Sequence, residues 1–348
     1  MMNLSIGIDV GDSDCFITGL TESGELIFEG KMIDTNNEEE WRELLMNLSS
    51  RFKMQAAFEI GSHYEWLFDL LMEYCFDVQV INTSDFTLIS HSSKKTDKID
   101  SIKIAEALHR GDLPTVYIPA KAVRADRRLV SFIHKHSQSL SKVKGRIRSL
   151  LKPLRMKCPY GDVLGKGSRQ WMSEEVLPKL EDQEKMFLEM LLAQGDLLME
   201  QRAELDSKVS KRLTEYENAK YLQSIPGFGP LTSLAVASAI DDVSRFAEPG
   251  RLSSYFGVCG SIFQSGSFRR MGPMTKRGNV HVRWLLSQSL KHLHTRDPKA
   301  RQRYKRLKRG KPTGVARGAQ MRWLTEIIWR LLTNKDFYRI ASKPRTAS

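Results

Sequence analysis

The alternation of apolar and polar residues near the N-terminus constrains the fold of this chain more than any other feature. Apolar side chains alternate over residues 4–10 and 15–20, and a turn at Ser23-Gly24 leads to a third segment at 26–28. Because successive side chains of a strand point to opposite faces of a sheet, this pattern predicts a hairpin that continues into a third antiparallel strand. Four further segments are predicted in chain order: a helix from Glu38 to about Phe52, a strand at 55–59, a helix at 64–74 and a strand at 78–81. Together they predict a mixed α/β sheet.

The first of these helices has a marked start. Asn36 and Asn37 stand directly before three glutamates at 38–40. Asparagine is a preferred helix cap, and acidic residues interact favourably with the positive end of the helix dipole. We therefore expect a capped helix that begins near Glu38 and buries Trp41.

The chain becomes basic and helical after residue 120. Nine lysines and arginines lie between Lys121 and Arg148, against the single acid Asp126. Pro153 and Pro159 end this helix, and a second helical stretch spans about 173–220. Two long helices joined by a proline-containing turn predict an antiparallel pair or a coiled coil. From residue 221 the sequence predicts helices with glycine-rich loops. Three domains are therefore expected, at 1–120, 121–220 and 221–348.

Charge and composition restrict the class of partner. The 348 residues carry a formal net charge of +13, which favours a polyanion such as nucleic acid or an anionic membrane surface. No apolar run approaches the roughly 20 residues that span a bilayer, and Asp9 interrupts the first apolar run, so neither a membrane partner nor a signal peptide is expected. The four cysteines form no CxxC pair, which makes a zinc finger or a disulfide framework improbable. These features indicate a reducing, cytoplasmic location.

Four carboxylates form a candidate metal site. Asp9 and Glu59 each lie at the end of a predicted strand, and Asp97 and Asp100 lie at the start of a predicted helix, three residues apart and therefore on one face. Oxygen ligands suit hard cations such as Mg²⁺, and two such ions can stabilise the attacking and leaving oxygens of a phosphoryl transfer. Taken singly, an aspartate at a strand end is more often a turn residue than a metal ligand, and an aspartate at a helix start is more often an N-cap.

The segments that contain these carboxylates resemble a known family. Ile6-Gly7-Ile8-Asp9, Phe58-Glu59 and Thr96-Asp97-Lys98-Ile99-Asp100 resemble the D-E-D-D set of the transposases of insertion-sequence family 110, which are relatives of the Piv DNA invertase. The resemblance implies an α/β N-terminal domain of RNase H-like (RuvC-like) fold, a helical coiled-coil region and a mainly α C-terminal transposase domain. It also implies Mg²⁺ or Mn²⁺ as cofactor. Ser101 departs from the small alanine expected after the last aspartate.

A second block, in the last third, resembles the same family. Gln264-Ser265-Gly266-Ser267 is followed by Lys276-Arg277-Gly278-Asn279 and then by Arg283. In the family a serine at this place attacks the DNA phosphate, and the resemblance assigns that role to Ser265. Nearby cations can stabilise a charged phosphorane, and Arg269, Arg270, Lys276 and Arg277 are the candidates. A loop serine in a Ser-Gly turn is the alternative interpretation, and Ser261 and Ser267 are rival nucleophiles.

Several segments are candidates for nucleic-acid contact. Gly227 and Gly229, in Ile225-Pro226-Gly227-Phe228-Gly229, let backbone amides approach a phosphate as in a helix-hairpin-helix element, although an ordinary tight turn explains them equally well. Nine lysines and arginines lie between Arg296 and Lys311 against the single acid Asp297, with Tyr304 and Leu307 at helical spacing, which is typical of a basic amphipathic helix. The remaining candidates are Arg124, Arg127, Arg128, Lys142, Lys144, Arg146, Arg148, Arg283, Arg301, Arg303, Lys305, Arg306, Lys308 and Arg309.

The resemblance also implies a mechanism and partners. Family members join the carboxylates and the serine in one composite site, sometimes across subunits of a dimer or tetramer, and form a covalent phosphoserine link to DNA. They also bind an RNA, transcribed from the element's flanking DNA, that bridges target and donor. Two other functions remain open: a metal-dependent junction nuclease in which water attacks and Ser265 is incidental, and a non-catalytic nucleic-acid-binding protein that has kept the fold.

Overall fold

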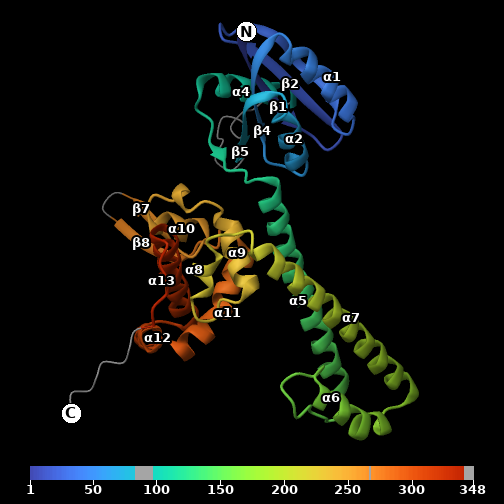
Figure 1. Ribbon diagram of the computed structural model, residues 1–348. Coiled ribbons are helices and arrows are strands. Elements are labelled where there is room, and N and C mark those ends of the chain that lie inside the picture. Colours follow the sequence, from blue (N-terminus) through green and yellow to red (C-terminus); the bar gives the residue numbers. More distant parts are fainter. Residues whose placement is uncertain (83–96, 266–267, 341–348) are drawn as a thin grey trace, which may run out of the picture. The chain divides into compact units, whose positions relative to one another are not determined.

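The computed structural model describes residues 1–82, 97–265 and 268–340, without the side chains of Asp97 and of residues 262–271. The chain forms two compact units, Met1–Ile118 and Pro119–Ser348, which are described separately (Figure 1). No helix within the described ranges is both long enough and apolar enough to cross a membrane.

The first unit is a mixed α/β domain, as the sequence predicts. Its elements are β1 (Met2–Val10), β2 (Asp14–Thr21), β3 (Leu26–Asp34), α1 (Glu38–Ser49), β4 (Phe52–Glu59), α2 (Tyr64–Leu71), β5 (Cys75–Ile81), α4 (Asp97–Arg110) and β6 (Thr115–Val116). The sheet has the order β3-β2-β1-β4-β5-β6. β2 lies antiparallel to both β1 and β3, whereas β4 lies parallel to both β1 and β5. This topology is consistent with the RNase H-like fold that the family resemblance implies.

Helices cover both faces of this sheet. Leu4, Ile6 and Ile8 share one hydrophobic core with Trp41 of α1 and Leu67 of α2. Residues 5, 7 and 9 of β1 point to the opposite face because strand side chains alternate. On that face α4 packs against Gly7, where a Cβ atom would overlap the backbone of Ser101 and Ala105. The absence of a side chain at position 7 therefore sets how closely α4 approaches β1.

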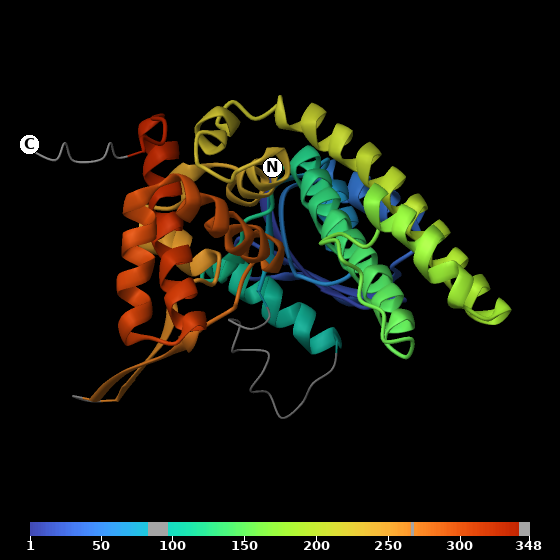
Figure 2. The ribbon, with the colours of Figure 1, turned by 90° about the horizontal axis from the view of Figure 1, so that it is seen from below.

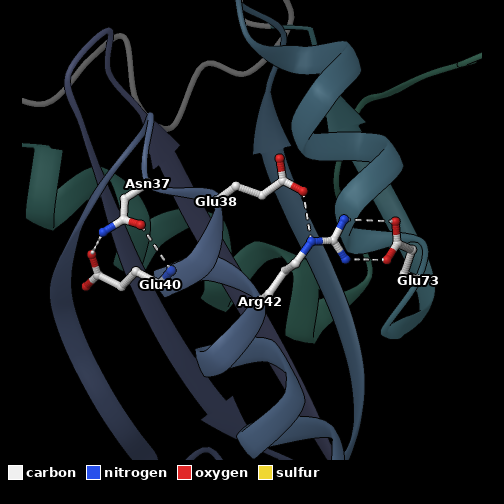
Figure 3. A network of polar contacts seen from close by, with 5 residues as sticks. All are labelled: Asn37, Glu38, Glu40, Arg42 and Glu73. Atoms are coloured by element: carbon white, nitrogen blue, oxygen red, sulfur yellow. Dashed lines mark hydrogen bonds and ion pairs between the residues drawn. The ribbon is translucent and has the colours of Figure 1, made fainter.

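The start of α1 confirms the predicted cap. Asn37 is the N-cap residue, and its side-chain oxygen accepts a hydrogen bond from the backbone nitrogen of Glu40 at 3.3 Å (Figure 3). Arg42, one turn later, bonds Glu38 on its own helix and Glu73 at 2.7 Å, just after α2. The hydrogen bond that Arg42 donates to the Glu73 carboxylate raises the pKa of Arg42 above its ordinary value. These exposed contacts hold α1 beside the end of α2.

The second unit is mainly helical. It contains α5 (Lys121–Leu151), α6 (Lys166–Trp171), α7 (Asp182–Leu213), α8 (Ala219–Gln223), α9 (Pro230–Ile240), α10 (Pro249–Tyr255), β7 (Gly260–Ser265), β8 (Phe268–Met274), α11 (Val280–Arg296), α12 (Pro298–Gly310) and α13 (Thr313–Asn334). One core joins α8, α9, α10, α11 and α13 to the near ends of α5 and α7. A second core fills the far end of the α5–α7 pair, around α6.

The helices α5 and α7 form the antiparallel pair that was one of the two predicted arrangements, as both views show (Figures 1 and 2). Arg212, near the end of α7, donates to Asp126 near the start of α5 at 2.8 Å. Arg202, earlier in α7, donates to Ser137, later in α5. The partner positions thus run in opposite directions along the two helices. Tyr216 also donates to Asp126, so this buried carboxylate accepts bonds from two side chains.

Two segments differ from the sequence prediction. The second long helix was expected from about residue 173, but α7 begins at Asp182, where Glu181 and Glu184 form a capping box. A π-helical turn at Met172–Val176 and a 3-10 turn at Leu177–Lys179 precede it, because Pro178 has no backbone N–H to donate within a helix. From residue 221 only helices with glycine-rich loops were expected, but β7 and β8 form a hairpin there (Figure 2).

Candidate functional site

Two of the predicted metal ligands lie at the ends of neighbouring parallel strands. The pairing of β1 with β4 sets Gly7 beside Ala57 and Ile8 beside Phe58, so Asp9 and Glu59 occupy the next position of each strand. Ala57 belongs to the small core beneath α4. Because side chains alternate along a strand, Asp9 and Glu59 share the face of Gly7 and Ala57. Both carboxylates are half-buried and face the layer that contains α4.

The third ligand lies on α4, above the same face. Asp100 stands one helical turn before Ile104, which packs against Ala57 and Ile81 of the sheet, so Asp100 faces the sheet as well. Its side chain is only 4% exposed and lies 3.2 Å from the ammonium of Lys103. A buried carboxylate requires a compensating cation. Lys103 supplies that charge, and a divalent ion would supply it more strongly.

The serine after Asp100 anchors α4 to the sheet. Ser101 departs from the expected alanine, and its hydroxyl lies 2.9 Å from the hydroxyl of Thr18 on β2 and donates to the carbonyl of Lys98 at 2.8 Å. Ser101 is fully buried. Serine in place of the expected alanine therefore adds a hydroxyl that hydrogen-bonds to the sheet and to its own helix. It does not alter the position of Asp100 at the start of α4.

Convergence of all four carboxylates stays a prediction. Asp97 begins α4, but its side chain lies outside the described residues. Among the side chains that are described, no group of three or more histidines, cysteines, aspartates or glutamates is arranged to hold a metal ion. The positions described above bring Asp9, Glu59 and Asp100 to one face of the sheet, with chemistry that suits a hard cation.

Ser265 belongs to the other compact unit. It is the last residue of β7, and its backbone pairs with Phe268 of β8 across the hairpin end. Its side chain, those of Arg269 and Arg270, and all of Gly266 and Ser267 lie outside the described residues. The rival Ser261 is described, and its hydroxyl donates to the carbonyl of Pro273 across the hairpin at 3.1 Å. That hydroxyl is therefore engaged in the hairpin itself.

Two glycines hold the basic loop that follows the hairpin. Gly257 (φ +65°) and Gly278 (φ +119°) adopt left-handed backbone conformations. A Cβ at Gly257 would overlap the carbonyl of Arg277, and one at Gly278 would overlap the carbonyl of Tyr255. The segments at 255–257 and 276–278 are thus pressed backbone against backbone. The sequence prediction gave Gly257 no role; a glycine between the apolar residues Phe256 and Val258 was the available signal.

The end of this basic loop starts α11. Asn279 caps the helix by accepting hydrogen bonds from the backbone nitrogens of His281 and Val282. Arg283, on the first turn, donates to the carbonyl of Phe256 at 3.1 Å, and burial lowers its pKa. Arg283 therefore helps to hold the loop, whereas Lys276 and Arg277 are exposed.

Replacing Gly257 by alanine should destabilise the second unit by about 3 kcal/mol, because the left-handed backbone and the overlap with Arg277 both disfavour a side chain. The free energy of unfolding is measured by urea denaturation, monitored by the circular dichroism signal of the helices. Gly250→Ala is the matched control: Gly250 lies within α10, where a Cβ meets only the Glu248 side chain, at 3.4 Å, and we expect a change within about 1 kcal/mol. Equal stability of the two variants would contradict the backbone contact.

The predicted basic residues of α5 divide into two groups. Arg124 is buried and donates to the carbonyl of Pro119, and Arg127 donates to the carbonyls of Ser238 and Ala239 at the end of α9. These two arginines hold α5 in its own unit. Farther along the helix the side chains turn to solvent, with Lys144 paired to Asp162 at 2.8 Å. The outward-facing cations of this stretch are Lys142, Arg146 and Arg148, and Arg128, nearer the start of the helix, is exposed as well.

The glycine turn before α9 borders a hollow. The hollow has a volume of about 440 Å³, and its lining includes Gly227, Gly229, His292 and Arg296. Gly227 has a φ of +93°, and a Cβ there would lie 2.8 Å from the carbonyl of Ser289 on α11. Gly227 thus serves the packing of the turn on α11, and Gly229 is the N-cap residue of α9. Both interpretations of this turn, tight turn and phosphate contact, are compatible with this geometry.

The basic run after residue 296 forms α12. Asp297 caps the helix by accepting bonds from the backbone nitrogens of Lys299 and Ala300. Arg301 is engaged within the unit, since it donates to the carbonyls of His294 and Thr295 at 2.7 Å. Of the other cations, Lys305, Arg306, Lys308 and Arg309 are exposed and Arg303 is half-buried.

Comparison with known proteins gives the family. Residues 6–156 match an IS110-type DEDD transposase family, described as transposase, and residues 219–305 match the family described as transposase IS116/IS110/IS902. One match covers most of the first compact unit and the other lies within the second, in the order that the two sequence blocks predict. The chain belongs to the IS110 family of DEDD transposases.

Individual relatives agree with this membership. The chain is 26% identical to the transposase of insertion sequence element IS1111A from Coxiella burnetii, over 71% of this chain and 69% of the relative. It is 24% identical to the transposase of element IS1328 from Yersinia enterocolitica, over 56% of this chain and 58% of that protein. Membership makes this chain an insertion-sequence transposase, which belongs to a class of enzymes that cut and rejoin DNA and whose DEDD members typically use a divalent metal.

Proposed function

We propose that this transposase cuts and rejoins DNA through Ser265, with Mg²⁺ or Mn²⁺ held by Asp9, Glu59, Asp97 and Asp100. The observation that carries the proposal is the placement of Asp9 and Glu59 at adjacent parallel strand ends, on the face covered by α4, where Asp100 is buried. Three carboxylates from three separate chain segments face one layer of the domain. Family membership independently supports a DNA substrate.

The carboxylates suit the proposed ions. Asp9 and Glu59 would hold a cation from the strand ends, and Asp97 and Asp100 from the first turn of α4. When bound, the ions supply positive charge to the transferring phosphate and its oxygens. Without them, Lys103 neutralises Asp100, which keeps a compensated charge on this face of the sheet.

The serine performs the transfer itself. Its Oγ forms a bond to the DNA phosphorus and the bond from that phosphorus to one strand oxygen breaks. The released oxygen takes up a proton from water and becomes the hydroxyl of the freed strand. A serine hydroxyl is a weak nucleophile at neutral pH, so its proton must pass to a base. We assign that base to the carboxylate set and infer that Ser265 reaches it in the assembled, nucleic-acid-bound form. Arg269, Arg270, Lys276 and Arg277 are the proposed partners of the phosphate charge.

The proposal extends to the partners and to the remaining fold elements. The DNA substrate comprises element ends and target, and a bridging guide RNA is the second nucleic acid. A homodimer or homotetramer would join the composite site, and the α5–α7 pair is the proposed coiled-coil element. Gly227, Gly229, the outward-facing cations of α5 and those of α12 are proposed nucleic-acid contacts.

Nucleic-acid affinity should fall steeply with salt, because each neutralised phosphate releases counterions. Replacing Lys305 and Lys308 by glutamate should weaken binding and lower the slope of log affinity against log salt by about one for each phosphate that the variant no longer neutralises. Fluorescence anisotropy titrations between about 50 and 200 mM salt measure this slope. Lys185→Glu, on α7 beside Asp182, is the control. An unchanged slope in the α12 variant would show that these lysines are solvated surface residues and do not contact phosphates.

Strand exchange between element-end and target DNA tests the proposed function. We expect activity with Mg²⁺ or Mn²⁺, loss in chelator, and recovery when the metal is restored in excess. A protein that only binds nucleic acid would show no exchange under any condition.

A second candidate, a metal-dependent junction nuclease, is favoured by one observation: the four carboxylates belong to a compact unit that does not contain Ser265. It would yield cleaved strands without exchange.

A further inference from the structure

A strongly basic hollow lies between α12 and α13. Its volume is about 420 Å³, and its lining consists of Lys299, Gln302, Arg303, Lys305, Arg306, Arg309 and Trp323. We call it the α12 hollow. Five of the seven lining residues are cationic and none is acidic. Within the described ranges, none of these five cations forms an ion pair. A concentration of uncompensated positive charge in one concave place favours a phosphate-bearing ligand.

One wall of the hollow is formed by the guanidinium of Arg303, which lies over the indole ring of Trp323. The Cζ atom of Arg303 lies 5.5 Å from the ring centroid of Trp323, which packs against the core of the unit. The Arg303 Nε atom is buried and has no hydrogen-bond partner among the described residues. A cation held over an aromatic face is attracted to it. The contact therefore fixes the guanidinium near the ring, with hydrogen-bonding capacity that the described part of the protein leaves unused.

These features fit an unpaired nucleotide better than a duplex backbone. A duplex offers phosphates to a surface but keeps its base faces stacked within the helix, so it would use only the cations. A single strand offers a phosphate together with an exposed base, and proteins commonly stack such bases on aromatic rings or on arginine planes. The hollow's volume lies within the range of small-ligand sites, which is large enough for one nucleotide.

We propose that the α12 hollow binds one unpaired nucleotide of a nucleic-acid strand, with its base against the Arg303 guanidinium and its phosphate among the surrounding cations. The inference rests on the proposed function, since it specifies the form of nucleic acid that this face of the transposase takes. The strand is either an unpaired part of an RNA or a DNA strand freed from its complement, and both present the same chemistry to the hollow.

The full-length Arg303→Lys variant tests this inference because it keeps the positive charge and removes the planar group. Fluorescence anisotropy would be measured with a labelled single strand, as RNA and as DNA, and with the blunt duplex of the same sequence. We expect about a tenfold loss of affinity for the single strand and less than about a twofold change for the duplex. A preference between the RNA and DNA probes identifies the source of the strand. Trp323→Leu, which removes the support, should produce the same selective loss, whereas Trp323→Phe should retain affinity.

Arg330→Lys is the matched control, because Arg330 is an exposed arginine of α13 that donates to the carbonyl of Glu326 and does not line the hollow, and the affinities of this variant should stay unchanged. Equal losses on single strand and duplex for Arg303→Lys would show a duplex groove and overturn the proposal, as would no loss on either. The proposed function and the proposed nucleotide site can be refuted independently of each other. Wild-type protein that forms no covalent DNA adduct, while Arg303→Lys loses single-strand binding selectively, would refute the serine mechanism and support the hollow.

Discussion

Replacing Asp9 by asparagine is expected to lower the rate of DNA strand cleavage at least about a hundredfold. Asparagine has nearly the same shape as aspartate but no negative charge, so a divalent cation loses one of its charged ligands. Asp9 is the penultimate residue of β1 and faces the layer of α4, next to Glu59 of β4. Because Asp9 is a strand-end residue outside the main core, the fold should persist. The measurement is the initial rate of cleavage of labelled element-end DNA at saturating Mg²⁺.

The neighbouring Asp12 provides a matched control. Its side chain is 94% exposed, beyond the end of β1, and accepts a hydrogen bond from Ser62 at 3.2 Å. Asp12→Asn removes the same charge three residues away and should leave the cleavage rate within about a factor of two, since exposed charges interact weakly across water. If the Asp9 and Asp12 variants cleave at equal rates, the carboxylate site is not at the strand ends.

Replacing Ser265 by alanine is expected to abolish strand exchange while leaving nucleic-acid affinity unchanged. The variant lacks the nucleophile, so exchange should fall at least about a thousandfold. Ser265→Cys is not equivalent to the wild type, because the longer C–S bond shifts the attacking atom, and we expect only a trace of attack. Ser261→Ala is the control, since the Ser261 hydroxyl is used within the hairpin. Strand exchange is measured on the substrates used for the wild type, and binding by anisotropy.

The Ser265 hypothesis is falsified if the alanine variant exchanges strands at the wild-type rate. In that case water or another hydroxyl attacks, and the junction-nuclease function becomes the better description. If exchange persists in Ser265→Ala and is lost in Ser267→Ala, the nucleophile is the rival serine two residues later. Reduced affinity in both variants would instead indicate a folding defect of the hairpin.

Alternation and capping predict most of the first unit. The strands at 4–10 and 15–20 and the helix beginning at Glu38 follow from side-chain period and from the Asn37 cap, which are local properties of the chain. The closeness of α4 to β1 is not local. It depends on the missing side chain of Gly7, and only the fold reveals that Ser101 lies against this glycine. The glycine alone predicts a close approach without naming the partner.

The second unit was harder to predict because its signals conflict. Residues 260–274 contain glycine, serine and arginine, which favour a loop, yet the pairing of β7 with β8 and the hydrogen bond from Ser261 to Pro273 make a hairpin. Tertiary pairing here overrides local preference. Charge was equally ambiguous. Arg127 and Arg283 appear in sequence as nucleic-acid contacts, but both donate to backbone carbonyls within the unit, and composition cannot distinguish these uses.

The carboxylates were identified by type and order, whereas their mutual placement depends on topology. Asp9 and Glu59 lie fifty residues apart and become neighbours because β4 pairs in parallel with β1. No periodicity within either segment contains that information. Asp100 joins the same face because the helix of Ile104 packs over Ala57. The family resemblance supplied this grouping in advance, since it links the residues by their order along the chain.

Denaturing gel electrophoresis of full-length protein, after incubation with end-labelled element DNA and Mg²⁺, tests the central claim most directly. We predict a labelled species that migrates with the protein, survives denaturation, disappears in chelator and in the Ser265→Ala and Asp9→Asn variants, and persists in Ser261→Ala and Asp12→Asn. Proteolysis and mass spectrometry of this species should locate the nucleotide on Ser265. Cleaved DNA without any protein-linked label, or a nucleotide on another residue, would contradict the claim.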